Sequence, residues 1–448
     1  MQLSGHSPFI VFDDANIEKA TDMAITAKFR NNGQVCISPN RFYIQESKKD
    51  EFVNLFVEKT KKLKIGDGMD PNVQLGPLTT KKRLNEIEEL VEKTGNLPMD
   101  LIKEIQAKAI KTGIYAANIP EEFGGGGLDT LTWLLYEKEL GKANYALHWT
   151  CVARPSNILC AGTKDQKEKY LKPCIEGKKW DCLAMTEPNA GSDLRGMAGS
   201  ARETASGDWV LNGTKHFISH ADIADFAIVF MASGIEETKR GPKKLITAFF
   251  VDKGTPGFSV REGYDNVSHR GYTNSILEFS DVKLSKDSIL GEVHKGFEVA
   301  NKWLGATRLQ VGATCLGRAE RAFNHAVEWA ATRQQFGQAI GKFQGTSFKL
   351  SDMAMELKAA ELLILEAGWK YDQGSATDLD MAMAKLKASE MLAMVSDEAI
   401  QIHGGMGLMT EHPLERIWRD ARLERIWEGT SEIQRHIISR SLLRPYEN

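Results

Sequence analysis

Residues 208–219 read DWVLNGTKHFIS, in which apolar and polar residues alternate with the period of two that a half-buried β-strand requires. Within this run, Asn212-Gly213 is typical of a two-residue type I′ hairpin turn, because both central residues of that turn need positive φ. Similar runs follow, separated by Gly, Pro, Asn and Asp: FAIVFMA at 226–232, LITAFFV at 245–251 and SILEFSDVKL at 275–284. The segment from about Cys182 to Lys283 is therefore predicted to form a β domain with a hairpin at Asn212-Gly213.

On both sides of this block the apolar spacing changes to that of helices. Downstream, long Ala-, Leu- and Met-rich helices with short connections favour a four-helix bundle. They are predicted at about Val293–Arg333, Thr346–Gln373, Asp378–Ile402 and Ser431–Leu443. Upstream, Pro98 suits the first turn of a helix that ends near Thr112, and further helices are predicted at Thr132–Gly141 and Asp165–Ile175.

The first stretch of the chain mixes short strands with amphipathic helices, which is typical of an α/β fragment. The strands are predicted at Phe9–Phe12 and Arg41–Gln45, and helices at Lys49–Leu63 and Thr79–Lys93. The chain therefore divides into four predicted parts: an α/β fragment at 1–95, a helical domain at 96–181, a β domain at 182–285 and a helical bundle at 290–448.

Composition excludes several classes of protein. The 448 residues carry a net charge of −3 with 26% charged and 42% hydrophobic residues, so no basic stripe for nucleic acid is expected. The longest apolar runs fall far short of the ~20 residues that span a bilayer, so no membrane segment is expected. Six cysteines without a C-x-x-C pair and the absence of a leader pattern favour a cytoplasmic protein with free thiols. No metal is expected, because the ten histidines form no ligand motif.

Two loops combine glycine with polar residues, and each has two readings. AMTEPNAGSDLRG at 184–196 is an ordinary turn, or a place where backbone N–H groups approach a ligand. In WEGTSEIQR at 427–435, Glu428 and Thr430 precede a helix, where they favour the helix dipole and cap it, or act as functional groups. Taken alone, neither loop decides between its readings.

From about Val91 to Asn448 the chain resembles the acyl-CoA dehydrogenase family. The resemblance is carried by six motifs in family order: IPEEFGG, AMTEPNAGSD, LNGTKHFIS, TRQQFGQAIGKFQ, QIHGGMG and WEGTSEIQR. It implies a helical domain without the family's usual first helix, a middle β-barrel or sandwich domain and a C-terminal four-helix bundle. It also implies bound FAD, dehydrogenation of an acyl-CoA to a trans-2-enoyl-CoA in fatty acid β-oxidation, transfer of electrons to an electron-transfer flavoprotein, and a homo-oligomer such as a homotetramer.

The resemblance assigns roles to individual positions. Glu428 matches the catalytic base, and the alternative base position of other members is occupied here by Thr307, before Arg308. Ser192, Arg308 and Gly429 match contacts to the acyl-CoA. Contacts to the flavin ring are matched by Leu183, Met185, Thr186, Phe217, Ile218, Ser219 and Thr430. Contacts to the pyrophosphate and adenosine, made in the family partly across a subunit boundary, are matched by Arg333, Phe336, Gln401, Gly404 and Gly405.

Three positions depart from the family pattern: Phe217 replaces a common Trp, Trp427 a common Tyr, and Glu432 a common Gln. An acidic Glu432 would weaken phosphate binding if it pointed inward. Two alternatives to a dehydrogenase remain open on sequence grounds. One is an acyl-CoA oxidase that uses oxygen as acceptor, and the other is a non-catalytic flavin-binding remnant.

The leading segment resembles a different family, the aldehyde dehydrogenases of the succinate-semialdehyde type. SGHSPFIVFDDA, KFRNNGQVCISPNRFYIQ and IGDGMDPNVQLGPL carry this resemblance, and Cys36 matches the nucleophile. The position of the general base, however, is occupied by Gln2, whose amide cannot accept the proton, and no NAD domain is recognisable before it. The expectation is a truncated fragment with Cys36 as a vestigial nucleophile, and NAD-dependent aldehyde oxidation is the unfavoured alternative.

Overall fold

The computed structural model describes residues 7–29, 38–63, 91, 95, 97–239 and 241–446. The chain divides into two compact units, residues 1–87 and 88–448. No helix of the described residues combines the length and apolarity needed to cross a membrane.

The first unit is a small α/β layer, as its sequence predicts. Strands β1 (Ser7–Val11) and β2 (Pro39–Ile44) pair in parallel, connected through helix α1 (Ile17–Phe29), and helix α2 (Glu46–Lys61) follows. Its core is built from Val11, Ile17, Ala24 and Phe52, with the rings of Phe9, Phe42 and Phe56 packed around Phe52. The predicted helix at Thr79–Lys93 and Cys36 lie outside the described residues, Val91 excepted.

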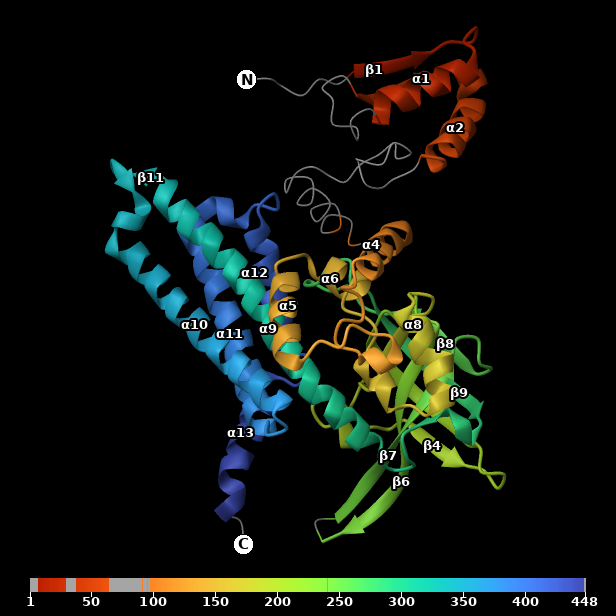
Figure 1. The fold of residues 1–448 in the computed structure, drawn as a ribbon, viewed down its shortest axis with the longest axis vertical. Helices are drawn as coiled ribbons and strands as arrows, with labels where there is room; N and C mark the ends of the chain where they lie inside the picture. The colour runs from red at the N-terminus through yellow and green to blue at the C-terminus, as the bar shows by residue number, and fades with distance from the viewer. Residues whose placement is uncertain are drawn as a thin grey trace. The chain divides into compact units, whose positions relative to one another are not determined.

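The second unit begins with short helices that pack on the sheet and the bundle (Figure 1). Helix α4 (Met99–Lys111) starts directly after Pro98, and α5 (Thr130–Gly141) and α6 (Tyr145–Cys151) follow. The predicted helix at 165–175 forms as α7 (Lys164–Gln166) and α8 (Lys172–Ile175), joined by one wider π turn at Lys167–Leu171. The sequence thus located α4, α5 and the segment of α7 and α8 within a few residues, but it did not predict α6.

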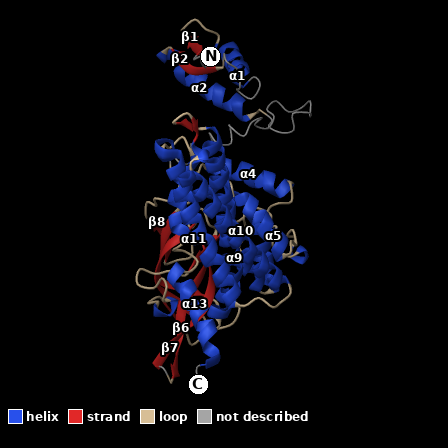
Figure 2. Cartoon of the chain, turned by 90° about the vertical axis from the view of Figure 1, so that its left-hand side faces the viewer, coloured by secondary structure: helices blue, strands red, loops and turns tan. Residues whose placement is uncertain are grey.

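The middle sheet has the strand order β10-β7-β6-β4-β5-β9-β8, with β3 paired in parallel to β6. Its strands are β3 (Asp181–Ala184), β4 (Ser200–Glu203), β5 (Trp209–Ser219), β6 (Phe226–Thr238), β7 (Gly241–Asp252), β8 (Phe258–Glu262), β9 (Asn274–Leu284) and β10 (Ile289–Leu290). The outer halves of β6 and β7 extend as a two-stranded ribbon beyond the rest of the sheet (Figures 1 and 2). The predicted β domain is confirmed.

The predicted hairpin at Asn212-Gly213 is wrong. Strand β5 continues through both residues, and its antiparallel connection to β4 is made by the turn between Glu203 and Trp209. Gly213 has φ +145° at an irregularity in the pairing with β9, and a Cβ placed on it would lie 2.7 Å from the Cα of Gly199. Glycine is needed here because two backbones approach closely, and not because the chain turns.

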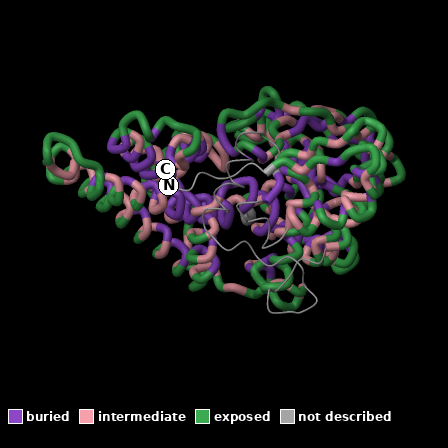
Figure 3. Tube along the Cα trace, turned by 90° about the horizontal axis from the view of Figure 1, so that it is seen from above, coloured by how far each residue is buried: buried purple, intermediate pink, exposed green. Residues whose placement is uncertain are grey.

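The C-terminal helices pack side by side (Figures 1 and 2). They are α9 (Gly296–Thr332), α10 (Gln344–Asp372), α11 (Asp378–His403) and α12 (Pro413–Glu424), and α13 (Ser431–Leu443) extends from their end. The sequence did not predict α12, although Leu414, Ile417 and Ala421 place it in the bundle core, whereas α13 buries only Ser431 and Gln434. The fourth helix of the bundle is therefore α12. Buried segments run through these helices and through the sheet (Figure 3).

Helix α5 crosses α9 at very close range. A Cβ on Gly317 would lie 1.9 Å from the carbonyl oxygen of Lys138, so no larger residue fits at this crossing. The contact fixes the position of α5, whose Trp133 and Glu137 face a cavity between the bundle and the sheet.

Candidate active site

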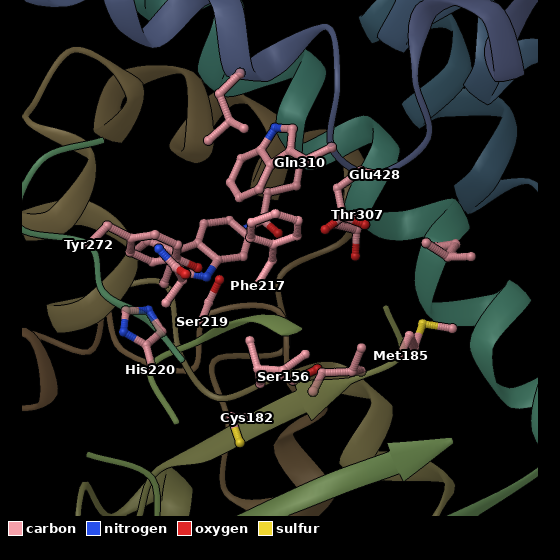
Figure 4. A pocket seen from close by; sticks show the side chains of 18 of the residues that line it. Ser156, Cys182, Met185, Phe217, Ser219, His220, Tyr272, Thr307, Gln310 and Glu428 are labelled. Carbon is pink, nitrogen blue, oxygen red and sulfur yellow. The ribbon is translucent and has the colours of Figure 1, made fainter. Parts of the chain in front are cut away.

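A cavity of about 610 Å³ lies among α5, α6, α9, strands β3 and β5 and the segment between α12 and α13. Figure 4 shows Glu428 and Thr307 on one side of it and Ser219, His220 and Tyr272 on the other. Ten of the sequence-predicted site residues line this one cavity: Leu183, Met185, Thr186, Ser192, Phe217, Ile218, Ser219, Glu428, Gly429 and Thr430. The structure therefore brings together residues that are more than 240 positions apart in sequence.

Glu428 stands on a tightly held turn. Its backbone has φ +52°, in the left-handed region that few residues other than glycine adopt, and Gly429 follows with φ +90°. Gln434 Nε2 donates to the carbonyl oxygens of Glu428 (3.2 Å) and Gly429 (2.9 Å), and Lys385 Nζ donates to the latter at 2.9 Å. These bonds hold a strained conformation that directs the carboxyl group into the cavity.

The environment of Glu428 sets its acidity. Burial raises the pKa of its carboxyl group from 4.5 to about 7, the charges of Lys385 and Arg308 oppose this rise, and the charge of Glu424 adds to it. A carboxylate whose pKa lies near neutrality is basic enough to accept a proton and is still partly ionised at pH 7. The site therefore offers a general base.

Glu424, one turn upstream, behaves in the opposite way. Although burial opposes ionisation, Arg318, His269 and Trp427 lower its pKa to about 2. Its side chain is fully buried, pairs with Arg318 and accepts hydrogen bonds from His269 Nε2 at 3.0 Å and Trp427 Nε1 at 2.7 Å. Glu424 is thus a permanent anion that fixes the indole ring beside the base.

A cluster of aromatic side chains forms the neighbouring wall, where Trp149, Tyr272 and Trp427 line the cavity and the buried rings of Tyr145 and His269 pack against them. The rings of Tyr145 and His269 stack at 3.8 Å, and Trp427 meets both at 5.2 Å. Tyr272, hydrogen-bonded to Ser219, approaches the same cluster, and the ring of Trp149 stacks on Tyr145 at 5.7 Å between centroids. The sequence singled out Trp427 and the loop at 269–274, but it did not indicate Tyr145, Trp149 or Glu424, because only the fold brings α6 and α12 to this loop.

A buried ion pair between Lys215 and Glu187 holds the loop at 184–196 in place. Lys215 Nζ, with no exposed surface, donates to Glu187 Oε1 at 2.7 Å and to the carbonyl oxygen of Met185 at 3.1 Å. The carboxylate of Glu187 also accepts from the backbone N–H groups of Ala198 (2.6 Å) and Gly199 (3.0 Å). The loop is therefore a fixed wall of the cavity.

Thr430 and Glu432 occupy the first turn of α13. Thr430 Oγ1 caps this helix by accepting from the N–H of Ile433 at 3.2 Å, so the capping interpretation is confirmed, while Thr430 also lines the cavity. Glu432 is exposed to solvent and does not line the cavity, so the inward orientation that would repel a phosphate is absent within this chain.

Arg308 lies behind the cavity wall. Its side chain is 8% exposed, with Nη1 at 3.7 Å from Asp378 Oδ1, and its charge acts on Glu428. Thr307 and Gln310 line the cavity, whereas Arg308 itself does not.

Five of the predicted residues lie at the far end of the bundle. Arg333 ends α9, Phe336 occupies a short hairpin of strands β11 (Gln334–Gln335) and β12 (Gln338–Ala339), and Gln401, Gly404 and Gly405 lie at the end of α11. Phe336 is 93% exposed. Along α9, Thr307 and Thr332 are separated by roughly 38 Å at 1.5 Å per residue, which is too far for one dinucleotide to contact both ends.

Comparison with known proteins agrees with this architecture. Residues 79–178, 182–282 and 294–443 match the N-terminal, middle and C-terminal domain models of acyl-CoA dehydrogenases. The chain belongs to the acyl-CoA dehydrogenase family. Residues 1–116 separately match the aldehyde dehydrogenase family, and this match overlaps the N-terminal acyl-CoA dehydrogenase domain.

Individual relatives cover nearly the whole of this acyl-CoA dehydrogenase region. A 3-(aryl)acrylate reductase of Clostridium sporogenes is 38% identical over 81% of this chain and 95% of its own length. The CarC subunit of the caffeyl-CoA reductase-Etf complex of Acetobacterium woodii is 37% identical over the same shares. The structure of butyryl-CoA dehydrogenase from Megasphaera elsdenii superposes with a TM-score of 0.71 at 35% identity, covering 82% of this chain and all of its own. Solved structures in this set include complexes with FAD.

Proposed function

We propose that this acyl-CoA dehydrogenase removes a proton from the α-carbon of an acyl-CoA thioester with Glu428, while a hydride leaves the β-carbon and a trans-2 double bond forms. The observation that carries the proposal is the strained, buried position of Glu428, which raises the pKa of its carboxyl group to about 7 inside a cavity with an apolar wall. The α-proton of a thioester is weakly acidic, so its removal needs a base held close in a site that excludes water.

The residues that line the cavity suit a flavin ring. Met185, Ile218 and Phe217 offer apolar surface, and the buried Nε2 of His220 has no hydrogen-bond partner among the described residues. Leu183, Thr186, Ser219 and Thr430 complete the proposed contacts to the ring. When bound, FAD accepts the hydride that leaves the β-carbon.

The chain's own groups would orient the thioester. In the part of the chain that the structure describes, the backbone N–H of Glu428 donates no hydrogen bond, so it is available to the thioester oxygen. Ser192 and Gly429 line the path proposed for the acyl-CoA, and Arg308 supports the ionised form of Glu428 from behind the wall.

The second cluster of predicted residues supports a homo-oligomer. Arg333, Phe336, Gln401, Gly404 and Gly405 would hold the pyrophosphate and adenosine of a neighbouring subunit's FAD, because the length of α9 separates them from their own cavity. We propose a homotetramer. Sedimentation with and without FAD tests this assembly.

Electrons would pass to an electron-transfer flavoprotein, and the context proposed from sequence is fatty acid β-oxidation in the cytoplasm. A relative named as part of a reductase-Etf complex supports this partner. Rapid reaction of the reduced enzyme with oxygen would instead identify an oxidase. The relatives that carry reductase names make it necessary to assay both directions of the reaction.

The decisive experiment is an anaerobic titration of the purified holoenzyme with butyryl-, isobutyryl- and octanoyl-CoA, in which flavin absorbance is followed. Bleaching by a thioester in the parent and its loss in Glu428→Gln would support both the reaction and the base. Equal bleaching rates in the two proteins would exclude Glu428 as the base, and a protein that does not retain FAD would overturn the proposal.

A further inference from the structure

The cavity contains a polar side chain that the proposed chemistry does not use. Gln310 lies on α9 at the spacing that places Leu304, Thr307 and Gln310 on one face of the helix, and all three line the cavity. Its side chain is only 8% exposed, and among the described residues it has no hydrogen-bond partner. A side chain that is nine-tenths buried and lines a cavity with an unpaired amide favours a polar ligand there.

The surroundings of Gln310 do not explain this amide. Trp133 of α5, Trp149 of α6, and Val152 and Ala153 directly after α6 line the same cavity. The one buried carboxylate on α5, Glu137, is already engaged, because it accepts from Trp133 Nε1 at 3.1 Å and contacts His148 Nε2 at 2.9 Å. Among these lining residues of α5, α6 and the segment that follows α6, Glu137 carries the carboxylate, and it is already hydrogen-bonded, so it does not pair with the amide of Gln310.

The position of Gln310 relative to the base indicates which part of a substrate it would meet. Thr307 lies beside Glu428, and Gln310 follows one helical turn farther along α9, about 4.5 Å along the helix axis (Figure 4). If the α-carbon lies at Glu428, this displacement corresponds to a group several bonds farther along the acyl chain. An unsubstituted alkyl chain would desolvate the amide without replacing its hydrogen bonds, at a cost of about tenfold to hundredfold in affinity.

We propose that the acyl end of the cavity selects acyl-CoA thioesters that carry a hydroxyl group two or three carbons beyond the α-carbon, with Gln310 as the residue that recognises it. The amide can both accept from a hydroxyl group and donate to it. A site that hydrogen-bonds a substrate hydroxyl discriminates strongly against the analogue that lacks it. This inference rests on the proposed function and names its substrate class.

The test compares matched thioesters on the holoenzyme: 4-hydroxybutyryl-CoA against butyryl-CoA, and 5-hydroxypentanoyl-CoA against pentanoyl-CoA. The parent enzyme is expected to favour at least one hydroxylated member by about tenfold or more in kcat/KM. Gln310→Met keeps the length of the side chain and removes its polarity, so it is expected to bring that ratio close to one and to raise kcat/KM for the alkyl member. Gln373→Met, at the exposed end of α10, is the matched control and should leave the ratio unchanged.

The outcomes separate this inference from the proposed function. Bleaching of the flavin with ratios near one in the parent, or with ratios unchanged by Gln310→Met, overturns the role of Gln310 and leaves the dehydrogenase intact. Equal changes for both members of each pair would indicate that water satisfies the amide, and would also overturn it. If no thioester bleaches the flavin, the proposed function fails, and this inference fails with it.

Discussion

The indole Nε1 of Trp427 donates a hydrogen bond of 2.7 Å to Oε2 of Glu424, and this bond ties the wall of the cavity to a buried anion. The opposite oxygen of Glu424 is held by Arg318 and His269. The residue next to the proposed base is therefore fixed by groups from α9, α12 and the β8–β9 connection.

Glu424→Gln is expected to destabilise the protein by about 3–5 kcal/mol, because it leaves the buried guanidinium of Arg318 without its counter-charge. Urea unfolding of the flavin-loaded protein measures this loss. The double variant Glu424→Gln/Arg318→Met should recover part of this loss. A loss of stability in the double variant equal to the sum of the losses in the two single variants would argue against the pairing of Glu424 with Arg318.

Acid should weaken the fold through the same group. The pKa of Glu424 is about 2 in the fold against an ordinary 4.5, because Arg318, His269 and Trp427 outweigh the effect of burial. Its stabilising contribution is therefore complete above about pH 4.5 and is lost as the pH falls towards 2. The difference in unfolding free energy between parent and Glu424→Gln should shrink over this range, and a constant difference would contradict the assignment.

Replacement of the base should abolish turnover. Glu428→Gln is nearly isosteric but cannot accept the proton, so kcat is expected to fall by at least about 10²- to 10⁴-fold while the enzyme still binds the thioester. Stopped-flow bleaching and equilibrium binding of acyl-CoA separate these two effects. Weakened binding with unchanged kcat would instead indicate a role in affinity.

The rate should follow the ionisation of Glu428. Burial raises the pKa of its carboxyl group to about 7, so kcat/KM is expected to increase with pH through neutrality as the basic form appears. Because the pKa is higher in the folded than in the unfolded protein, Glu428 lowers the unfolding free energy as the pH rises from 4.5 through 7. The unfolding free energy of Glu428→Gln minus that of the parent should therefore be larger at pH 8 than at pH 5. A flat rate profile between pH 6 and 8 would refute this description.

Lys385 should adjust that profile. The buried ammonium group favours ionised Glu428, so Lys385→Met is expected to move the rise of kcat/KM to higher pH. Lys387→Met is the matched control, because Lys387 belongs to the same helix but pairs with Glu356 away from the cavity. Equal shifts in both variants would point to a general effect of charge.

Gly213→Ala should disrupt the sheet, because the added methyl group would lie 2.7 Å from the Cα of Gly199 in a backbone with φ +145°. A loss of about 2–4 kcal/mol is expected. Gly207→Ala, in the turn before β5 with open space around it, carries only the backbone strain and should cost less. Thermal unfolding of the two variants provides the comparison.

These contrasts show what the sequence can and cannot reveal. The pattern of residues 208–219 located β5 well, although Trp209, Val210 and Leu211 are buried in succession and do not alternate. Asn212-Gly213 has the composition of a turn, and only the neighbouring Gly199 reveals why glycine is present. Helix α12 was missed because Arg416, Asp420 and Glu424, polar but buried, interrupt its apolar stripe. A buried charge is tolerated in α12 because its partners belong to segments that are distant in sequence. The local sequence therefore does not indicate the pairing.

The cavity residues were found through short motifs whose members lie next to one another in sequence, such as Phe217 with Ser219 and Glu428 with Thr430. Trp149, which lines the cavity, and Tyr145 behind it were not found, because their importance arises from ring contacts between separate elements. Motifs thus identify the groups that react, whereas the shape of the acyl pocket depends on packing.

The separation of Glu428 from Arg333 by the length of α9 has a genetic consequence. If each flavin is held at its ring by one chain and at its adenosine by another, an inactive Glu428 variant and an inactive Arg333 variant damage different halves of the same composite site. Mixed assemblies of the two would then contain some sites in which both contributing halves are intact, so two individually dead alleles should restore part of the activity when expressed together. Dilution below the assembly threshold should release the flavin from the parent enzyme itself.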